Sequence, residues 1–176
     1  MSSVADRIEI RQAATAEERQ RIYRFRYAVY VEEMGKRADS YADHEQKTLS
    51  DRLDESAVLF YATVGEHVVG TIRCNCLAET AVPEEHRAIY QLDRFSPFPA
   101  EKIWFTSRLM IEQHQRGTMA LPVLLSHVYD FGLQRAAMFD FCNCAPSRVE
   151  LSERLGYRRY IDNFVDPEVG YRVPLV

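Results

Sequence analysis

Residues 103–120 read IWFTSRLMIEQHQRGTMA, and this stretch decides the fold. The apolar run over residues 103–111 predicts a buried strand, and apolar residues recur at helical spacing over residues 119–136. Between them lie Arg116, Gly117 and Thr118. Glycine lets a backbone approach a ligand, and the free amides at a helix start favour an anion such as a pyrophosphate. Taken alone, the same residues also fit an ordinary turn.

Working outward, local patterns predict the other elements. Thr15 and Glu18 have the spacing of a capping box, which marks the start of a helix over residues 16–34. Residues 35–55 are polar and long for a connection, so we expect them to cover a site. The remaining predictions are strands at residues 7–11, 57–64, 68–76, 138–142, 157–161 and 170–173, and helices at residues 84–92 and 146–155.

The order of these elements predicts an α/β (α+β) fold with a central mixed, mostly antiparallel sheet flanked by helices. A chain of 176 residues, 47% of them hydrophobic, is long enough to bury one core and too short for two comfortably sized domains. We therefore expect residues 1–176 to form a single domain.

Composition and charge exclude several classes of protein. The formal net charge is −4, from 26 acidic and 22 basic residues, so no overall basic field exists to hold a nucleic acid. No apolar run approaches the roughly 18 residues of a membrane span, and residues 1–10 lack the apolar core of a signal peptide. We expect a cytoplasmic protein with no membrane span and no nucleic-acid partner.

The four cysteines form two Cys-Asn-Cys triplets, Cys74/Cys76 and Cys142/Cys144. A four-thiolate zinc site is one interpretation, but zinc ligands in such motifs are separated by two or more residues. Both triplets also lie at the ends of predicted strands, where alternate residues share a face. We expect no metal, and thiols that are buried or line a pocket.

The order of elements, the Arg-Gly loop before the long helix and the later Glu153-Arg154-Leu155-Gly156-Tyr157 together resemble the GNAT acyltransferase superfamily. The resemblance implies a GNAT-like fold and an N-acyltransferase that moves an acyl group directly from a pantetheine thioester to an amine. The donor groove would lie between the strands ending near Ile111 and Cys142. The resemblance implies donor contacts at Leu109, Met110, Ile111, Arg116, Gly117, Thr118, Met119 and Ala120.

A second resemblance narrows the subfamily. The segments 26–30, 51–54, 70–73 and 107–109 are similar, in order and spacing, to the polar signatures of acyl-homoserine-lactone synthases and long-chain N-acyl amino acid synthases. This similarity implies acyl-CoA or acyl-phosphopantetheine as donor, the latter on an acyl carrier protein, and an amino acid as a candidate amine. Phe105 and Lys36 replace an acid and a tryptophan of the signatures, which argues against homoserine-lactone synthesis itself.

Five charged residues are candidates for the acceptor site. Arg73 and Arg108 interrupt apolar strands, where an unpaired buried charge would cost several kcal/mol, so they need partners. Solvated surface pairs are the alternative interpretation. From the match to the family signatures we expect one network beside the thioester carbonyl, with Arg108 as a catalytic residue and the others binding the acceptor: Arg26, Asp51, Asp54 and Arg73.

Acyl transfer from a thioester needs an uncharged amine and a polarised carbonyl. Backbone amides near residues 109–111 are candidates to polarise the carbonyl, and Glu33 or Glu112 to relay the amine proton, although both glutamates also fit a surface role. Ser152 stands where the resemblance places the tyrosine acid of many GNAT enzymes, and we expect it to hydrogen-bond the sulfur.

The acyl chain needs an apolar pocket, and the predicted elements meet at a groove. We expect it to be lined by Phe105, Leu109, Leu124, Val128, Phe139 and Phe141. Two other functions fit the same residues. One is a short-chain acetyltransferase acting on a polyamine, an amino sugar or a protein amine, and the other is a catalytically silent acyl-CoA sensor. The acceptor, the chain length and the oligomeric state are not determined by the sequence.

Overall fold

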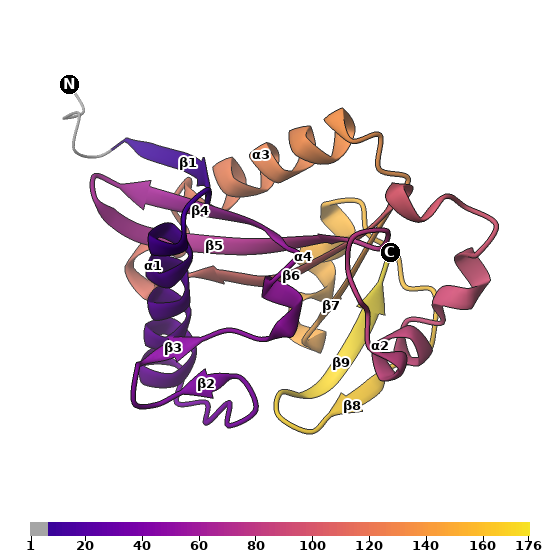
Figure 1. Ribbon diagram of the computed structural model, residues 1–176, viewed down its shortest axis with the longest axis horizontal. Helices are drawn as coiled ribbons and strands as arrows, with labels where there is room; N and C mark the ends of the chain where they lie inside the picture. The colour runs from indigo at the N-terminus through magenta and orange to yellow at the C-terminus, as the bar shows by residue number, and fades with distance from the viewer. Residues whose placement is uncertain (1–6) are drawn as a thin grey trace.

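The computed structural model describes residues 7–176, and its centre is a seven-stranded sheet (Figure 1). All neighbouring strands are antiparallel except the parallel pair β6 and β7, which confirms the predicted mixed, mostly antiparallel sheet. In spatial order the strands are β1 (Ile8–Gln12), β4 (Val58–Val64), β5 (His67–Cys76), β6 (Ile103–Ile111), β7 (Phe139–Cys144), β9 (Gly170–Leu175) and β8 (Phe164–Asp166).

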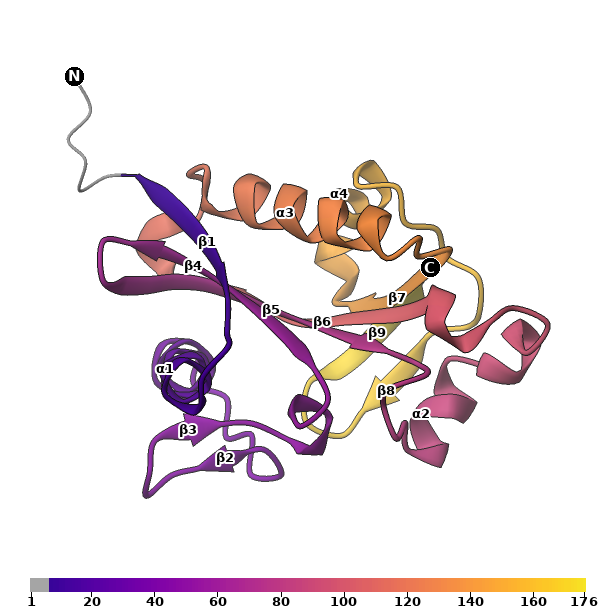
Figure 2. The same cartoon turned by 45° about the horizontal axis from the view of Figure 1, so that its top comes forward.

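Helices cover both faces of the sheet (Figure 2). The long helix α3 (Ala120–Gln134) and the short α4 (Val149–Arg154) lie above the sheet in this view, and α1 (Ala16–Tyr27) and α2 (Glu84–Ile89) lie below it. A small hairpin, β2 (Ala42–Asp43) and β3 (Thr48–Leu49), lies beside α1. Within the described residues, no helix is both long and apolar enough to span a bilayer.

Helix α1 starts at the predicted capping box. The Thr15 side chain accepts the Glu18 amide, and the Glu18 carboxylate accepts the Thr15 amide at 2.9 Å and the Tyr61 hydroxyl at 2.8 Å. The cap therefore also ties α1 to β4. The helix continues as a π-helix over Ala28–Glu33, which confirms the helix predicted for residues 16–34.

Two predictions from the sequence need correction. The segment 35–55, treated above as one long connection, contains the β2–β3 hairpin and a 3₁₀ turn at Arg52–Asp54. The strand predicted at residues 157–161 is wrong, because only Arg159 forms an isolated bridge there. The outer partner of β9 is β8 instead, and the Asp166 carboxylate accepts two backbone amides at 2.9 Å in the turn that joins them.

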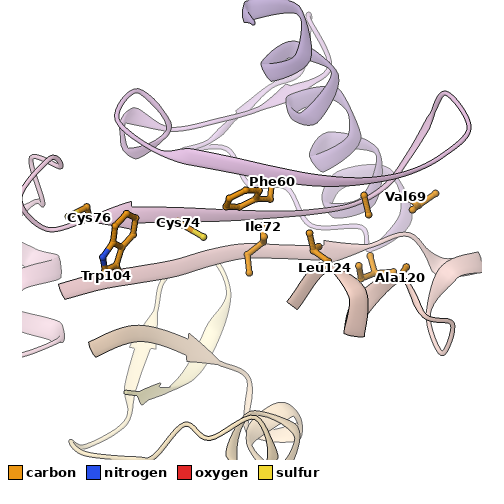
Figure 3. Close-up of a cluster of buried hydrophobic side chains, with 10 residues drawn as sticks. Phe60, Val69, Ile72, Cys74, Cys76, Trp104, Ala120 and Leu124 are labelled. Atoms are coloured by element: carbon orange, nitrogen blue, oxygen red, sulfur yellow. The ribbon is translucent and has the colours of Figure 1, made fainter. Parts of the chain in front are cut away.

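Strands β6 and β7 diverge soon after they start. They pair only over Ile103–Phe105 and Phe139–Phe141, and beyond this point β6 stays with β5 while β7 stays with β9. The opening lies between the two strands that were expected to flank the donor groove. Residues of β5 and β6 that face α3 form a buried cluster with Phe60 of β4 and with Ala120 and Leu124 of that helix (Figure 3).

A bulge in β6 lies beside the opening. Thr71 pairs with Met110 and Arg73 pairs with Ser107, so two residues of β6 lie opposite one residue of β5. Arg108 is one of the two, and its φ of 54° is in the left-handed region that few residues other than glycine adopt. Bulges redirect side chains, and this one lies at the proposed thioester site.

Candidate active site

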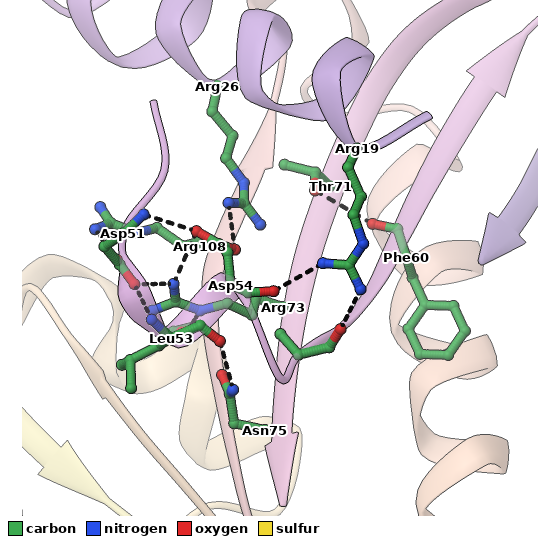
Figure 4. Close-up of polar contacts among 12 residues, drawn as sticks. Arg19, Arg26, Asp51, Leu53, Asp54, Phe60, Thr71, Arg73, Asn75 and Arg108 are labelled. Carbon is green, nitrogen blue, oxygen red and sulfur yellow. Dashed lines mark hydrogen bonds and ion pairs between the residues drawn. The ribbon is translucent and has the colours of Figure 1, made fainter. Parts of the chain in front are cut away.

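The five charged residues predicted to converge do so on the α1 side of the sheet (Figure 4). Arg26 reaches from α1 to Asp54 at 2.8 Å, and Arg73 of β5 contacts Asp54 at 3.2 Å. The Asp51 carboxylate forms ion pairs with Arg73 at 2.6 Å and with Arg108 of β6 at 2.7 Å. The predicted network is therefore present, while its role in binding an acceptor stays a prediction.

A tightly bonded turn holds the two aspartates. The Asp51 carboxylate accepts the Leu53 amide at 2.9 Å, and the Asp54 carboxylate accepts the Asp51 amide at 3.0 Å. From outside the turn, Arg19 donates to the Asp54 carbonyl at 2.7 Å and Asn75 donates to the Leu53 carbonyl at 2.8 Å. The backbone of the turn is thus fixed by α1 and β5 before any ligand binds.

The network runs from the core to the surface. The side chains of Arg26 and Asp54 are 0% and 2% exposed, whereas those of Asp51 and Arg108 are 14% and 13% exposed. Burial raises the pKa of the Asp51 carboxyl, but Arg73 and Arg108 outweigh this effect and lower that pKa to about 2. The solvated-pair interpretation is therefore wrong for the inner residues, and only the outer end can contact a ligand.

The bulge explains how Arg108 joins this network. Ser107 accepts a hydrogen bond from Arg73 at 3.0 Å, so it faces the same side of the sheet as Asp51. Neighbouring residues of a regular strand face opposite sides, and the left-handed backbone of Arg108 breaks this alternation. The Arg108 guanidinium also lies 4.3 Å from the centre of the Tyr41 ring. Sequence reasoning missed Tyr41 individually, although the segment expected to cover a site contains it.

The predicted donor loop lies directly before α3. Gly117 has a φ of +84°, and a side chain there would meet no atom within 4 Å, so the loop backbone is open to a ligand. Arg116 points back to the protein, where it donates to the Ile111 carbonyl at 3.0 Å and to the Glu33 carboxylate. Glu33 also accepts the Gln113 amide at 3.1 Å. The loop is therefore tied to the end of the π-helix.

The other residues predicted to contact the donor differ in their exposure and in their hydrogen bonds. Thr118 accepts the Ala120 amide at 3.2 Å, and Met119 provides no side-chain cap for α3. Met110 and Ile111 are buried, while Leu109 is 44% exposed and is the open part of the strand. The donor contacts predicted for these residues stay a prediction.

The two other candidate proton-transfer groups have partners in the structure. Glu112 contacts the ring of His67 at 2.8 Å, and the Ser152 hydroxyl donates to the Arg148 carbonyl of its own helical turn at 3.2 Å. A hydroxyl bonded to the preceding turn must rotate before it can reach a sulfur atom. The catalytic roles of Glu33, Arg108 and Ser152 stay predictions.

A cavity of about 510 Å³ lies between the sheet and α3. Side chains of β5, β6, β7 and α3 form most of its wall, and Leu155 and Tyr157 close one side. Its lining is mainly apolar, with Ile72, Trp104, Leu125, Val128 and Phe131 contributing large side chains. A concave, mostly apolar space of this size is typical of a ligand site.

The lining of this cavity differs from the lining predicted for an acyl pocket. Only Val128 and Phe139, of the six residues expected, line this cavity. Leu124 is completely buried in the core and Leu109 is exposed. Phe105 and Phe141 belong to an aromatic cluster, with Tyr90, on the other face of the sheet. Phe105 alternates with Trp104 and Thr106, which line the cavity, and must therefore point the opposite way.

Sequence reasoning also missed a polar group in the cavity wall. Thr106 donates to the Asp140 carboxylate at 3.0 Å, and the Tyr157 hydroxyl donates to the same carboxylate oxygen. Burial raises the pKa of Asp140 to about 6, although both hydrogen bonds lower it. The available signal was a charged residue within an apolar strand, the same signal that identified Arg73.

The cysteines are free and most of their surface is covered. Cys74 and Cys76 are buried, and Cys74 lines the cavity. Burial raises the pKa of both Cys74 and Cys142, so these thiols stay protonated at neutral pH. Over residues 7–176, no group of three or more His, Cys, Asp or Glu side chains is arranged to hold a metal ion.

Comparison with known proteins identifies the family of the sequence and relatives of the fold. The sequence model of the family described as "N-acyl amino acid synthase FeeM" matches residues 21–176. No curated protein matches the chain. Among solved structures, FeeM, an N-acyl amino acid synthase from uncultured soil microbes, superposes with a TM-score of 0.73 at 16% identity, covering 96% of this chain and 89% of that chain.

Two acyl-homoserine lactone synthases are similar in the same way. For BjaI, a CoA-dependent enzyme, the TM-score is 0.76 at 15% identity, with 96% of this chain and 82% of that chain covered. For LasI the TM-score is 0.67 at 18% identity, with 96% and 87% covered. At these identities the likeness shows the fold alone, and it confirms the predicted GNAT-like architecture.

The burial of Asp54 leads to a prediction about stability. Asp54→Ala should lower the free energy of unfolding by about 3–5 kcal/mol, because it leaves Arg26 charged, buried and unpaired. Replacing both partners with apolar residues, Arg26→Met with Asp54→Leu, should recover part of this loss, because it removes the unpaired charge but leaves the Asp51 amide without its acceptor. Urea unfolding followed by circular dichroism measures both effects.

The matched control is Asp39→Ala, which removes an exposed ion pair with Arg37 and should change the unfolding free energy by less than about 1 kcal/mol. If both alanine substitutions change the free energy of unfolding by the same amount, the buried ion pair is no more important for stability than the exposed one.

Proposed function

The chain belongs to the FeeM family of N-acyl amino acid synthases, and from this premise we propose that it transfers a long acyl group from a pantetheine thioester to the amine of an amino acid. The observation that carries the proposal is the apolar cavity of about 510 Å³ beside the point where β6 and β7 diverge. An acetyl group does not need such a volume, whereas a long alkyl chain does.

The donor is proposed to bind in the opening between β6 and β7. Its pantetheine arm follows the exposed edge at Leu109, and its phosphate meets the open backbone at Gly117 and the start of α3. The acyl chain then turns beneath α3 into the cavity. Either coenzyme A or an acyl carrier protein supplies this arm, because the contacts proposed here involve the pantetheine and its phosphate.

The reaction is proposed as direct attack of the amine nitrogen on the thioester carbon. The carbon–nitrogen bond forms, the carbonyl oxygen gains negative charge near the amides of the β6 bulge, and the carbon–sulfur bond then breaks. Glu33 takes the proton of the amine through water, and the departing thiolate takes a proton from water. The Ser152 hydroxyl rotates away from the Arg148 carbonyl and donates a hydrogen bond to the sulfur. The Glu33 carboxylate already holds Arg116 and Gln113, so proton transfer is coupled to the donor loop.

The acceptor is proposed to bind at the outer end of the charged network. One nitrogen of the Arg108 guanidinium donates a hydrogen bond to Asp51, and the guanidinium plane lies against the Tyr41 ring. The other N–H groups of the guanidinium are left for an acceptor carboxylate. Asp51 keeps the guanidinium in place, while Arg26, Asp54 and Arg73 hold Asp51 and its turn from within. We place the reaction in the cytoplasm, a reducing compartment that suits the four free cysteines.

Donor chain length provides the main test. The rate constant kcat/KM should rise from acetyl to dodecanoyl thioesters, because each buried methylene favours binding by about 0.8 kcal/mol until the cavity is full. Val128→Trp narrows the cavity and should move the optimum to shorter chains. A flat response would favour the short-chain acetyltransferase, and donor binding without release of free thiol in the presence of amino acids would favour the sensor.

The donor loop can be tested at Gly117. Gly117→Val should weaken binding of coenzyme A by roughly tenfold or more, because a β-branched residue strains a left-handed backbone and moves the loop amides. Gly65→Val is the matched control, since Gly65 also has a positive φ and open surroundings but lies in the β4–β5 turn. Calorimetric titration compares the two variants, and equal affinities would contradict this placement of the donor.

The acceptor site can be tested at Arg108. Arg108→Lys should lower kcat/KM for an amino acid by roughly tenfold to a hundredfold, because the lysine cannot form the paired hydrogen bonds to a carboxylate. The rate with the same amine lacking its carboxylate should change little. Arg11→Lys, at the exposed ion pair with Glu9 on the edge strand β1, is the control. If kcat/KM falls by the same factor for the amino acid and for the amine without a carboxylate, Arg108 does not recognise the carboxylate.

A further inference from the structure

Arg172 of β9 lies across the opening between β6 and β7 from the charged network. The last residues that pair between these strands are Phe105 and Phe141, and the same offset puts Ser107 of β6 opposite Asn143 of β7. Ser107 contacts the charged network, and Asn143 accepts a hydrogen bond from Arg172. Since alternate residues of a strand share a face, both sides of the opening carry arginine on the same face of the sheet.

Neutral oxygen atoms hold the Arg172 side chain in place. Its Nε donates to Oδ1 of Asn143 at 2.7 Å, and one terminal nitrogen donates to the Asn143 carbonyl at 3.1 Å. The Asn143 amide in turn donates to the Tyr90 hydroxyl at 2.5 Å, which fixes its orientation. Over residues 7–176 no carboxylate forms an ion pair with Arg172, although this residue is partly buried.

Two acidic side chains of the β8–β9 hairpin bind backbone amides instead of Arg172. Asp166 accepts two amides of its own turn at 2.9 Å, and Glu168 accepts the Ser40 amide at 3.0 Å. The second contact joins the hairpin to the segment 35–55, and the two lie side by side in Figure 1. The hairpin is thereby held beside the segment that was expected to cover the site.

The hydroxyl of Tyr30 lies near both outer arginines. Tyr30 belongs to the π-helix that continues α1. Burial raises its pKa, and the charges of Arg108 and Arg172 both act against this effect. Because a charge shifts a pKa strongly only at short range, both guanidinium groups lie close to this one hydroxyl. Arg108 and Arg172 therefore flank the proposed acceptor site from different strands.

The charges of the site match an acceptor with two carboxylates. The charged network contains three arginines and two aspartates, so it carries one net positive charge, and Arg172 adds a second. An amino acid that attacks with an uncharged amine has one negative charge on its α-carboxylate. A second carboxylate in its side chain would supply the counter-ion for Arg172, since a partly buried charge is costly without one.

We propose that the acceptor is an amino acid with a carboxylate in its side chain, which Arg172 binds while Arg108 binds the α-carboxylate. This inference rests on the proposed function, because it assumes that an amino acid binds at the outer end of the charged network. Arg172 is then a specificity-determining residue, and Asn143 is the residue that positions its guanidinium. Glutamate and aspartate belong to this chemical class.

The experiment compares glutamate with glutamine, which has nearly the same shape and no side-chain charge. Dodecanoyl-CoA is the donor, and release of free thiol is the readout. We expect kcat/KM of the wild-type enzyme to be roughly tenfold higher for glutamate, because hydrogen bonds between charged groups are stronger than those to a neutral amide. Equal kcat/KM for the two acceptors would overturn this inference and leave the proposed function intact.

Variants of Arg172 test the assignment of the residue. Arg172→Gln removes the charge and should reduce the ratio of kcat/KM for glutamate to that for glutamine to about twofold or less. Arg172→Lys keeps the charge without the paired hydrogen bonds, and should give an intermediate ratio. Arg158→Gln is the matched control, because Arg158 also donates to neutral oxygens, the carbonyls of Glu153 and Tyr157. The control should keep the wild-type ratio.

Arg108→Lys should lower kcat/KM for glutamate and glutamine by a similar factor, because both have the α-carboxylate. A preference for glutamate that survives in Arg172→Gln would overturn the role of Arg172. Absence of transfer to every amino acid tested would overturn the proposed function, and this inference with it.

Discussion

The buried carboxylate of Asp54 is the constraint on which the site depends. It forms ion pairs with Arg26 of α1 and Arg73 of β5, so it joins a helix, a turn and the middle of the sheet. Two nitrogens of Arg26 have no partner among the described residues, and apolar residues of the same volume would pack there without that cost. The network therefore serves mainly to orient side chains and less to stabilise the fold. It holds Asp51 and Arg108, at its partly exposed end, in one orientation.

The separation of β6 from β7 is the second constraint. Because β6 remains paired with β5 and β7 with β9, the sheet opens without losing its outer strands. The bulge at Arg108 lies on the open length of β6, where it turns the arginine toward Asp51 and leaves Leu109 exposed. One irregular residue thus connects the two functions proposed for the site, the binding of the acceptor and the polarisation of the carbonyl.

The two faces of the sheet have different chemistry. The face toward α1 carries the charged network, and the face toward α3 carries the mainly apolar cavity. A thioester between β6 and β7 would have its acyl chain on one side and its acceptor on the other. In that arrangement the sheet would separate the hydrated acceptor from the hydrocarbon chain. The acyl chain binds by leaving water, whereas the charged acceptor stays partly hydrated.

The sequence by itself determined most strands of the sheet, the cap of α1 and the helix α3, which follow from apolar periodicity and a capping box. The members of the charged network were predicted from the resemblance to the family signatures, together with two arginines within apolar strands that need partners. Only the tertiary structure decided which side chains line the cavity, how Arg108 faces Asp51, and that Trp104 lies opposite Asp140. Each of these depends on the register between strands far apart in the chain, and the packing of the whole sheet sets that register.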